Sequence, residues 1–175
     1  MITWNSDSPI FKDLIDELKP KKIIEIGSWH GGSAIRMAQL APEAEITCID
    51  TWLGASEFYT KKTKDRDLQF KDGFPQVFYT FKANTKDYPN IKALPLPSHE
   101  ARNLVQDADL IYIDGSHDFD AVYQDIKDYH LKAPVLFGDD YTNKDFEVRQ
   151  AVDKFCEDYG YKIEVKYNWF WIIRR

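Results

Sequence analysis

Five short apolar runs restrict the fold of this chain more than any other feature of its sequence. The runs are Lys22–Ile26, Ile46–Ile49, Ile91–Leu96, Leu110–Ile113 and Val135–Phe137. Apolar residues are nearly continuous within each run, whereas a strand with one face in water would alternate apolar and polar residues. Continuous runs of this length are typical of strands that are covered on both faces, and we therefore expect five strands of a parallel sheet.

Segments with apolar residues at helical spacing separate most of these runs, and another such segment precedes the first run. They are residues 9–18, Ser33–Leu40, Phe119–Tyr129 and Phe146–Tyr159. Pro20 follows the first segment and Gly160 follows the last, and both residue types commonly end helices. This alternation of strands and helices predicts an α/β fold with a doubly wound, mostly parallel sheet.

The C-terminal stretch YKIEVKYNWFWIIRR differs because no helical pattern interrupts it. It predicts two strands joined by a short turn near Tyr167-Asn168, and strands joined by so short a turn run antiparallel. We therefore expect seven strands, with an antiparallel hairpin at the C-terminal end of the sheet.

The 175 residues are predicted to form a single domain, residues 1–175. Residues 54–90 form a long polar and aromatic insertion between the second and third expected strands. Within it, Pro75–Thr85 favours a helix and the preceding half favours a loop. Long loops in compact domains are often functional, so two interpretations stay open, a solvated insertion and a lid that faces the substrate.

Charge and composition exclude several classes of partner. The formal net charge of −6 argues against a general nucleic-acid binder, and no apolar run approaches the roughly 18 residues of a membrane span. The N-terminal residues show no signal-peptide pattern. Cys48 and Cys156 lack metal-ligand spacing, so we expect two free, buried thiols in a reducing, cytoplasmic compartment. The sequence leaves open whether the chain forms a homodimer.

A glycine-rich loop follows the first expected strand, in the stretch KKIIEIGSWHGGSAIRMA. Trp29 stands where a dinucleotide-binding fingerprint needs its second glycine, and the loop has no Lys-Ser or Lys-Thr pair of a P-loop. Glu25 beside the loop would repel phosphate but suits an ammonium group, and Asp50 after the second strand can accept both ribose hydroxyls. These residues fit S-adenosylmethionine better than NAD; the alternative is a strand–helix turn without a ligand.

The stretches IIEIGSWHGGSA and ITCIDTW resemble the cofactor loop and the ribose-binding acid of class I S-adenosylmethionine-dependent methyltransferases. The resemblance implies a Rossmann-like fold with S-adenosyl-L-methionine as cofactor. It puts the methionine part at the loop, the ribose at Asp50 and the adenine near the turn LPLPSHEA, which lacks the acidic residue commoner there. The expected cofactor-binding residues are Glu25, Gly27, Ser28, Gly32, Asp50, Thr51, Ser98 and His99.

Three more acidic residues follow the fourth and fifth expected strands: Asp114, Asp139 and Asp140. The two strands are expected to be neighbours, so the three carboxylates would lie close together and repel one another. Mg²⁺ or another hard divalent cation would relieve this repulsion, and no Cys or His is placed to suggest zinc. The sequence therefore predicts a metal site formed by these three residues; the alternative is that they only cap helices and form turns.

Asp114-Gly115-Ser116-His117 and Asp139-Asp140-Tyr141 resemble the pattern of a subgroup of metal-assisted O-methyltransferases. This subgroup is grouped with macrocin O-methyltransferase and the cephamycin-biosynthesis methyltransferases. The resemblance spans residues 22–159 and implies methyl transfer to a hydroxyl of a small molecule, with a saccharide or glycosylated metabolite as the first expectation. One departure is the segment LKAPVLF, where the subgroup has a glycine-rich turn before the fifth strand.

His117 and Asp114 are the expected catalytic residues. His117 lies in the same loop as Asp114, where a neutral imidazole could take the proton of a metal-bound hydroxyl, or could only anchor the loop. Three other functions stay open. They are a metal-independent N- or O-methyltransferase, a non-catalytic S-adenosylmethionine-binding protein and an NAD-linked oxidoreductase, against which Trp29 argues.

Overall fold

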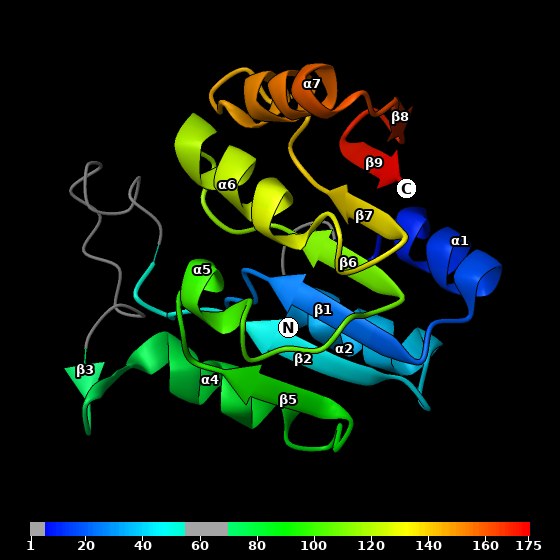
Figure 1. The fold of residues 1–175 in the computed structure, drawn as a ribbon. Helices are drawn as coiled ribbons and strands as arrows, with labels where there is room; N and C mark the ends of the chain where they lie inside the picture. The colour runs from blue at the N-terminus through cyan, green and yellow to red at the C-terminus, as the bar shows by residue number, and fades with distance from the viewer. Residues whose placement is uncertain (1–5, 55–69) are drawn as a thin grey trace.

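The computed structural model describes residues 6–54 and 70–175, in which a central sheet lies between two layers of helices (Figure 1). Along the sheet the strands are β5 (Ile91–Leu94), β2 (Glu45–Ile49), β1 (Lys22–Ile26), β6 (Leu110–Ile113), β7 (Val135–Gly138), β9 (Phe170–Arg174) and β8 (Ile163–Lys166). The strands from β5 to β7 are parallel, and β9 is antiparallel to both β7 and β8. The predicted seven-stranded, doubly wound sheet with an antiparallel C-terminal hairpin is confirmed.

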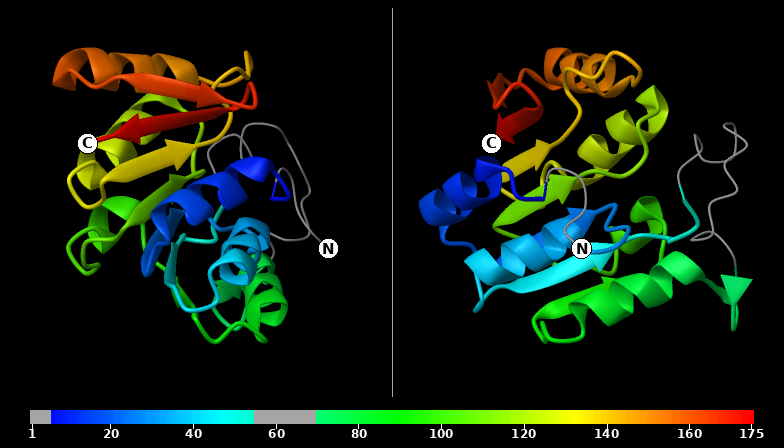
Figure 2. Two further views of the ribbon diagram at one scale, coloured as in Figure 1. Left: turned by 90° about the vertical axis from the view of Figure 1, so that its right-hand side faces the viewer. Right: turned by 180° about the vertical axis from the view of Figure 1, so that it is seen from behind.

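Within residues 6–54 and 70–175, three helices cover each face of the sheet, and Figure 2 shows the two helical layers from two further sides. On one face lie α1 (Pro9–Leu18), α2 (Gly32–Leu40) and α4 (Gln76–Thr85), and on the other lie α5 (Ser98–Ala101), α6 (Phe119–Tyr129) and α7 (Val148–Tyr159). Every residue of β6 and β7 is buried, which explains why these strands lack alternation in the sequence. Among the described helices, none has the length and apolar character that crossing a membrane requires.

The C-terminal hairpin turns at the two residues that the sequence indicated. Tyr167 and Asn168 both have positive φ, at 52° and 66°, and the Trp169 amide donates a hydrogen bond to the Lys166 carbonyl at 3.3 Å. Two consecutive central residues with positive φ are typical of a type I′ turn, whose twist matches that of the flanking strands.

Part of the predicted insertion at residues 54–90 is regular structure. β3 (Phe70–Lys71) and β4 (Phe74–Pro75) form a small antiparallel hairpin, and α4 confirms the helix expected at Pro75–Thr85. Val77 and Phe81 of α4 are buried in the core. Residues 55–69, which include most of the predicted loop, lie outside the described residues.

The structure tests the predicted bounds of the third strand and the last helix, and the predicted state of the two cysteines. The third expected strand ends at Leu94 rather than Leu96, and the last helix begins at Val148 rather than Phe146. Cys48 and Cys156 are free and buried, as expected.

Candidate functional site

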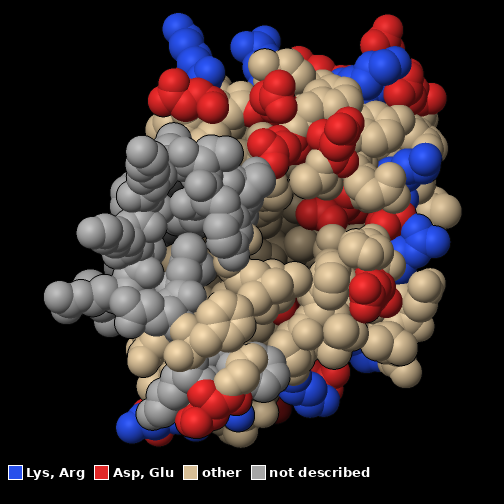
Figure 3. Space-filling view, turned by 90° about the vertical axis from the view of Figure 1, so that its left-hand side faces the viewer, with Lys and Arg blue, Asp and Glu red and all other residues tan. Residues whose placement is uncertain are grey.

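The parallel strands all end at one edge of the sheet, and the predicted site residues follow those ends. In Figure 3 this edge faces the viewer, and a hollow on it is bordered by acidic side chains. Open α/β sheets bind ligands outside the carboxyl ends of their strands, so this edge is the candidate site.

Glu25 lies beneath the glycine-rich loop and is completely buried. Its carboxylate accepts hydrogen bonds from the hydroxyls of Ser28, at 2.6 Å, and Ser33, and from the Cys48 thiol at 3.3 Å. Burial raises the pKa of Glu25, and these hydrogen bonds oppose that rise. Glu25 therefore holds the loop in shape, and its predicted contact with the cofactor stays a prediction.

Two glycines of the loop adopt a left-handed backbone for reasons that the structure makes explicit. Gly27 has a φ of 83°, and a Cβ on it would lie 2.0 Å from the carbonyl oxygen of Asp114. Gly31 has the same φ, and a Cβ there would lie 3.0 Å from side-chain atoms of Phe81 and Thr85. Gly32 begins α2. Gly27 is thus required by the close approach of the turns that follow β1 and β6.

Asp50 follows β2 and ties that strand to the glycine-rich loop. Its Oδ2 accepts hydrogen bonds from the amides of Ser28 and Trp29, both at 2.9 Å, and its Oδ1 accepts one from the Trp52 amide at 2.7 Å. A carboxylate has about four acceptor positions, so Asp50 has room for about one more donor. The hydroxyl of the neighbouring Thr51 accepts a hydrogen bond from the Leu53 amide.

Ser98 and His99 begin the short helix α5, after the end of β5. The Ser98 hydroxyl donates a hydrogen bond to Asp125 Oδ1 at 2.5 Å, and the Tyr129 hydroxyl donates one to the Ser98 carbonyl at 2.8 Å. His99 is exposed and lies 3.9 Å from a Glu100 carboxylate oxygen. Asp125 is not among the residues predicted from the sequence, although an acid on the apolar stripe of a predicted helix is an unusual feature that could have indicated it.

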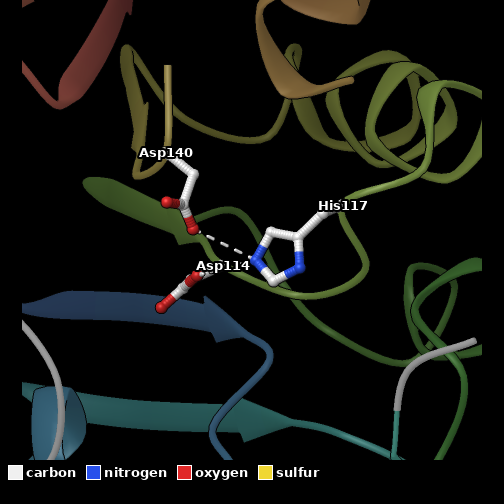
Figure 4. Close-up of side chains that lie close together, drawn as sticks. All are labelled: Asp114, His117 and Asp140. Atoms are coloured by element: carbon white, nitrogen blue, oxygen red, sulfur yellow. Dashed lines mark ion pairs between the residues drawn. The ribbon is translucent and has the colours of Figure 1, made fainter. Parts of the chain in front are cut away.

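Asp114, His117 and Asp140 converge at the ends of β6 and β7 (Figure 4). His117 Nε2 lies 3.2 Å from Asp140 Oδ2 and 3.9 Å from Asp114 Oδ1. One potential ligand atom from each residue lies within 4.8 Å of the other two. This spacing suits a metal ion. The sequence predicted a group of three carboxylates, whereas in the structure His117 lies in the group with Asp114 and Asp140.

Asp139 is placed differently from its neighbour Asp140. Its side chain is 7% exposed, and its Oδ1 accepts a hydrogen bond from the Asp140 amide at 2.5 Å. It also lines a small cavity of about 10 Å³, together with Asp114, His117 and Trp171. The structure thus groups Asp140, rather than Asp139, with Asp114 and His117, and a metal role for Asp139 stays a prediction.

The two carboxyl groups that face His117 have opposite pKa shifts. Burial, together with the nearby charge of Asp139, raises the pKa of Asp114 to about 7, against the charge of His117 and the hydrogen bond from the Tyr112 hydroxyl. Burial also tends to raise the pKa of Asp140, but hydrogen bonds from His117 and Asn143 outweigh it and leave that pKa below its ordinary value. One acid in the group therefore retains a proton near neutral pH while the other is ionised.

Local structure fixes the positions of His117 and Asp140. The His117 ring stacks on Phe146, with ring centres 4.0 Å apart and planes at 8°. Asp140 has a φ of 59°, and its Oδ1 accepts a hydrogen bond from the Asn143 side-chain amide at 3.0 Å. A positive φ at a non-glycine residue costs free energy and is often found at functional sites.

An Asp114→Asn variant is expected to be more stable than the wild-type protein at about pH 8 when divalent cations are absent. The folded-state pKa of Asp114, about 7, exceeds the value of about 3.9 in an unfolded chain, so only the folded state holds this proton between those pH values. The stability contributed by protonated Asp114 is therefore complete below about pH 4 and is lost as the pH rises through 7.

We expect the variant to gain about 2 kcal/mol, because 32% of the Asp114 side chain is exposed and solvent screening reduces the full effect of about 4 kcal/mol. Urea unfolding at about pH 4.5 and about pH 8 measures this difference. The same pH dependence in both proteins would contradict the expectation.

Comparisons with known proteins agree with the fold. A family model described as "Methyltransferase domain" matches residues 24–141, which include the glycine-rich loop, Asp114, Asp139 and Asp140. No curated protein matches the chain.

Three solved structures illustrate the similarity. The SAH-bound methyltransferase PaMTH1 of Podospora anserina is 17% identical, with 94% of this chain and 76% of that chain covered and a TM-score of 0.64. The O-methyltransferase of Bacillus cereus in complex with SAH is 13% identical, with 99% and 82% covered and a TM-score of 0.64. Cofactor-bound Rv0187 from MTB is 14% identical, with 99% and 81% covered and a TM-score of 0.67. At these identities the structural similarity demonstrates a shared fold.

Proposed function

Since the chain belongs to the methyltransferase domain family, we propose that it transfers a methyl group from S-adenosylmethionine to a hydroxyl oxygen of a small molecule. A hard divalent cation, Mg²⁺ in the first instance, assists the transfer. The observation that carries this proposal is the group of Asp114, His117 and Asp140, which lies at the same sheet edge as the glycine-rich loop.

The residues at the glycine-rich loop fit the sulfonium cofactor better than a nucleotide with phosphates. Glu25 is buried under the loop, and an acid there disfavours a phosphate group. Asp50 has room for about one further donor, which a ribose hydroxyl can supply. The buried acid supports S-adenosylmethionine over NAD, whereas Asp50 suits the ribose of either cofactor.

The acids in the group of Asp114, His117 and Asp140, called the metal-site group below, also fit a divalent cation. The carboxylate oxygens of Asp114 and Asp140 suit Mg²⁺ or Mn²⁺, and His117 is assigned to proton transfer rather than to the cation. Burial keeps Asp114 partly protonated near pH 7, and a bound cation would replace that proton. Asp139 is close enough to influence Asp114 by its charge and is proposed as a further oxygen ligand.

A bound cation would lower the pKa of an acceptor hydroxyl and fix its position. His117 is the residue proposed to take the hydroxyl proton, and Asp140, whose Oδ2 lies 3.2 Å from His117 Nε2, would stabilise the imidazolium that forms. Phe146 holds the imidazole plane by stacking on it. The remaining contribution of the chain is to align the acceptor oxygen with the methyl group.

The identity of the acceptor rests on the resemblance to the metal-assisted O-methyltransferases. We propose a hydroxylated small molecule, with a saccharide or glycosylated metabolite first, and neither nucleic acid nor a membrane as partner. We also propose a cytoplasmic location. Measurement of the oligomeric state decides whether the chain forms a homodimer.

Calorimetric titration is expected to show binding of S-adenosylmethionine and of S-adenosylhomocysteine (SAH) at least about tenfold tighter than that of NAD⁺. Methyl transfer to a panel of hydroxylated compounds should then depend on Mg²⁺ or Mn²⁺ and stop in EDTA. Preference for NAD⁺, or binding of neither ligand, would reject the proposed cofactor. Tight SAH binding with transfer that EDTA leaves unchanged would reject the role of the metal.

A further inference from the structure

Asp125 is a buried acid that the proposed mechanism does not use. It lies in the middle of α6, on the same side as the buried residues Val122, Ile126 and Tyr129, and it is 8% exposed. Burial of a carboxylate among apolar residues is costly unless its oxygens are hydrogen-bonded. The partners of both oxygens therefore need to be accounted for.

The two oxygens of Asp125 have different surroundings. Oδ1 accepts the hydrogen bond from the Ser98 hydroxyl at 2.5 Å. Oδ2 accepts no hydrogen bond from any residue in the described ranges, and it lies 3.7 Å from the point that a Cβ on residue 115 would occupy. Residue 115 is glycine, so no side chain covers this oxygen from the turn that follows β6.

Asp125 lies between two turns at the ligand-binding edge of the sheet. Ser98 follows the end of β5, and Gly115 follows the end of β6. Ile26, the last residue of β1, has a side-chain atom 3.7 Å from the same virtual Cβ on residue 115. The Tyr129 hydroxyl, one helical turn beyond Asp125, holds the Ser98 carbonyl at 2.8 Å. Asp125 and Tyr129 thus fix the Ser98 turn, and Oδ2 remains an acceptor beside it.

We propose that Asp125 Oδ2 accepts a hydrogen bond from the exocyclic amino group of adenine, and that this contact makes the site select adenine over hypoxanthine. This inference rests on the proposed function, because it takes the ligand to be an adenine nucleoside derivative. Adenine presents a donor at this position, whereas hypoxanthine presents a carbonyl oxygen. A buried acceptor facing another acceptor leaves both without a partner, and sites of this kind discriminate strongly.

The charges around Asp125 are compatible with an acceptor role near neutral pH. Burial raises its pKa to about 6, opposed by the hydrogen bond from Ser98, so the group is mostly ionised at pH 7. Asp128 raises this pKa by its charge and His99 lowers it, and Arg102 forms an ion pair with Asp128.

An Asp125→Asn variant separates this role from a purely structural one. When Ser98 donates to the amide oxygen at the position of Oδ1, the amide nitrogen takes the position of Oδ2, so an acceptor is replaced with a donor while the bond that fixes the turn is kept. The Ser98 hydroxyl can also accept from the amide nitrogen, and Asp125→Ala, which removes both oxygens, is therefore measured beside Asp125→Asn. A structural role predicts no change in base preference, whereas a recognition role predicts that the preference moves toward hypoxanthine.

Calorimetric titration with SAH and with its deaminated analogue, S-inosylhomocysteine, tests the inference. The wild-type protein should bind SAH at least about tenfold more tightly, and the ratio of dissociation constants should approach one or reverse in Asp125→Asn. Asp120→Asn, which removes an exposed acid from the same helix, should keep the wild-type ratio.

Equal binding of the two ligands by the wild-type protein, or a wild-type ratio in both Asp125→Asn and Asp125→Ala, would overturn the inference while leaving the proposed function intact. Binding of neither ligand by the wild-type protein would instead overturn the proposed function. A thermal unfolding curve for each variant confirms that the proteins compared are folded.

Discussion

An Asp140→Asn variant is expected to lose methyl transfer about a hundredfold in the presence of Mg²⁺, while its affinity for SAH stays within about twofold of wild type. The substitution removes the negative charge from the carboxylate that lies 3.2 Å from His117 Nε2. It therefore weakens the proposed metal site and withdraws the charge that would stabilise a protonated His117. Asparagine also tolerates positive φ, so the φ of 59° at this position adds little strain.

Asp145→Asn is the matched control for this prediction. Asp145 lies five residues farther along the same segment and is exposed, so its substitution changes the net charge equally without altering the metal-site group. Turnover should be measured across a range of Mg²⁺ and Mn²⁺ concentrations, and cation affinity by calorimetry. If Asp140→Asn matched Asp145→Asn in turnover, or remained fully active in EDTA, the metal site would have to be abandoned.

The sequence predicted the sheet well because buried parallel strands leave an unmistakable pattern. The first expected strand coincides with β1, and the turn of the C-terminal hairpin falls at Tyr167-Asn168. The third expected strand ended early because pairing with β2 stops at the Ile49–Leu94 pair, and Pro95 follows. Proline has no amide hydrogen, so it cannot continue the hydrogen bonds between neighbouring strands. Our prediction gave more weight to the apolar pattern than to this proline.

The start of the last helix shows a tertiary contact overriding a local pattern. Phe146 has the right spacing for the apolar stripe of α7, yet it lies before the helix and stacks on His117. The Glu147 carboxylate accepts a hydrogen bond from the Phe119 amide and the Glu147 amide donates one to the His117 carbonyl, which joins the two loops. Both contacts join segments far apart in the sequence, so the helical periodicity could not reveal them.

The sequence predicted that the candidate site residues follow the carboxyl ends of the parallel strands, where the structure has them, but it could not assign their hydrogen-bond partners. Asp139 and Asp140 are adjacent in the chain, yet the Asp139 carboxylate is buried and the Asp140 carboxylate faces His117. Asp140 has a positive φ, and the sequence does not reveal this backbone conformation. Similarly, Asp50 was expected to face a ribose, and most of its acceptor capacity serves backbone amides of the loop. Motifs specify which residues reach an edge, whereas hydrogen-bond partners depend on backbone conformation.

The second large effect is expected at Gly27, where substitution by alanine should cost more than about 4 kcal/mol of unfolding free energy. A Cβ at this position would lie 2.0 Å from the Asp114 carbonyl oxygen, a backbone atom that cannot rotate away. The φ of 83° adds the strain of a left-handed backbone. Since whole domains are stable by about 5–15 kcal/mol, Gly27→Ala should be largely unfolded or should melt at a much lower temperature.

Gly160→Ala provides the control that isolates the collision from the strain. Gly160 also has a left-handed backbone, with a φ of 73°, but a Cβ there would have no neighbour within 4 Å. This variant should therefore lose only about 1 kcal/mol, measured like Gly27→Ala by denaturant unfolding followed by circular dichroism. Equal losses in the two variants would show that the loop after β1 does not press on Asp114. A much larger loss at Gly27 would mean that this glycine serves first to bring the glycine-rich loop against the turn that follows β6, so that the two halves of the proposed active site depend on one backbone contact.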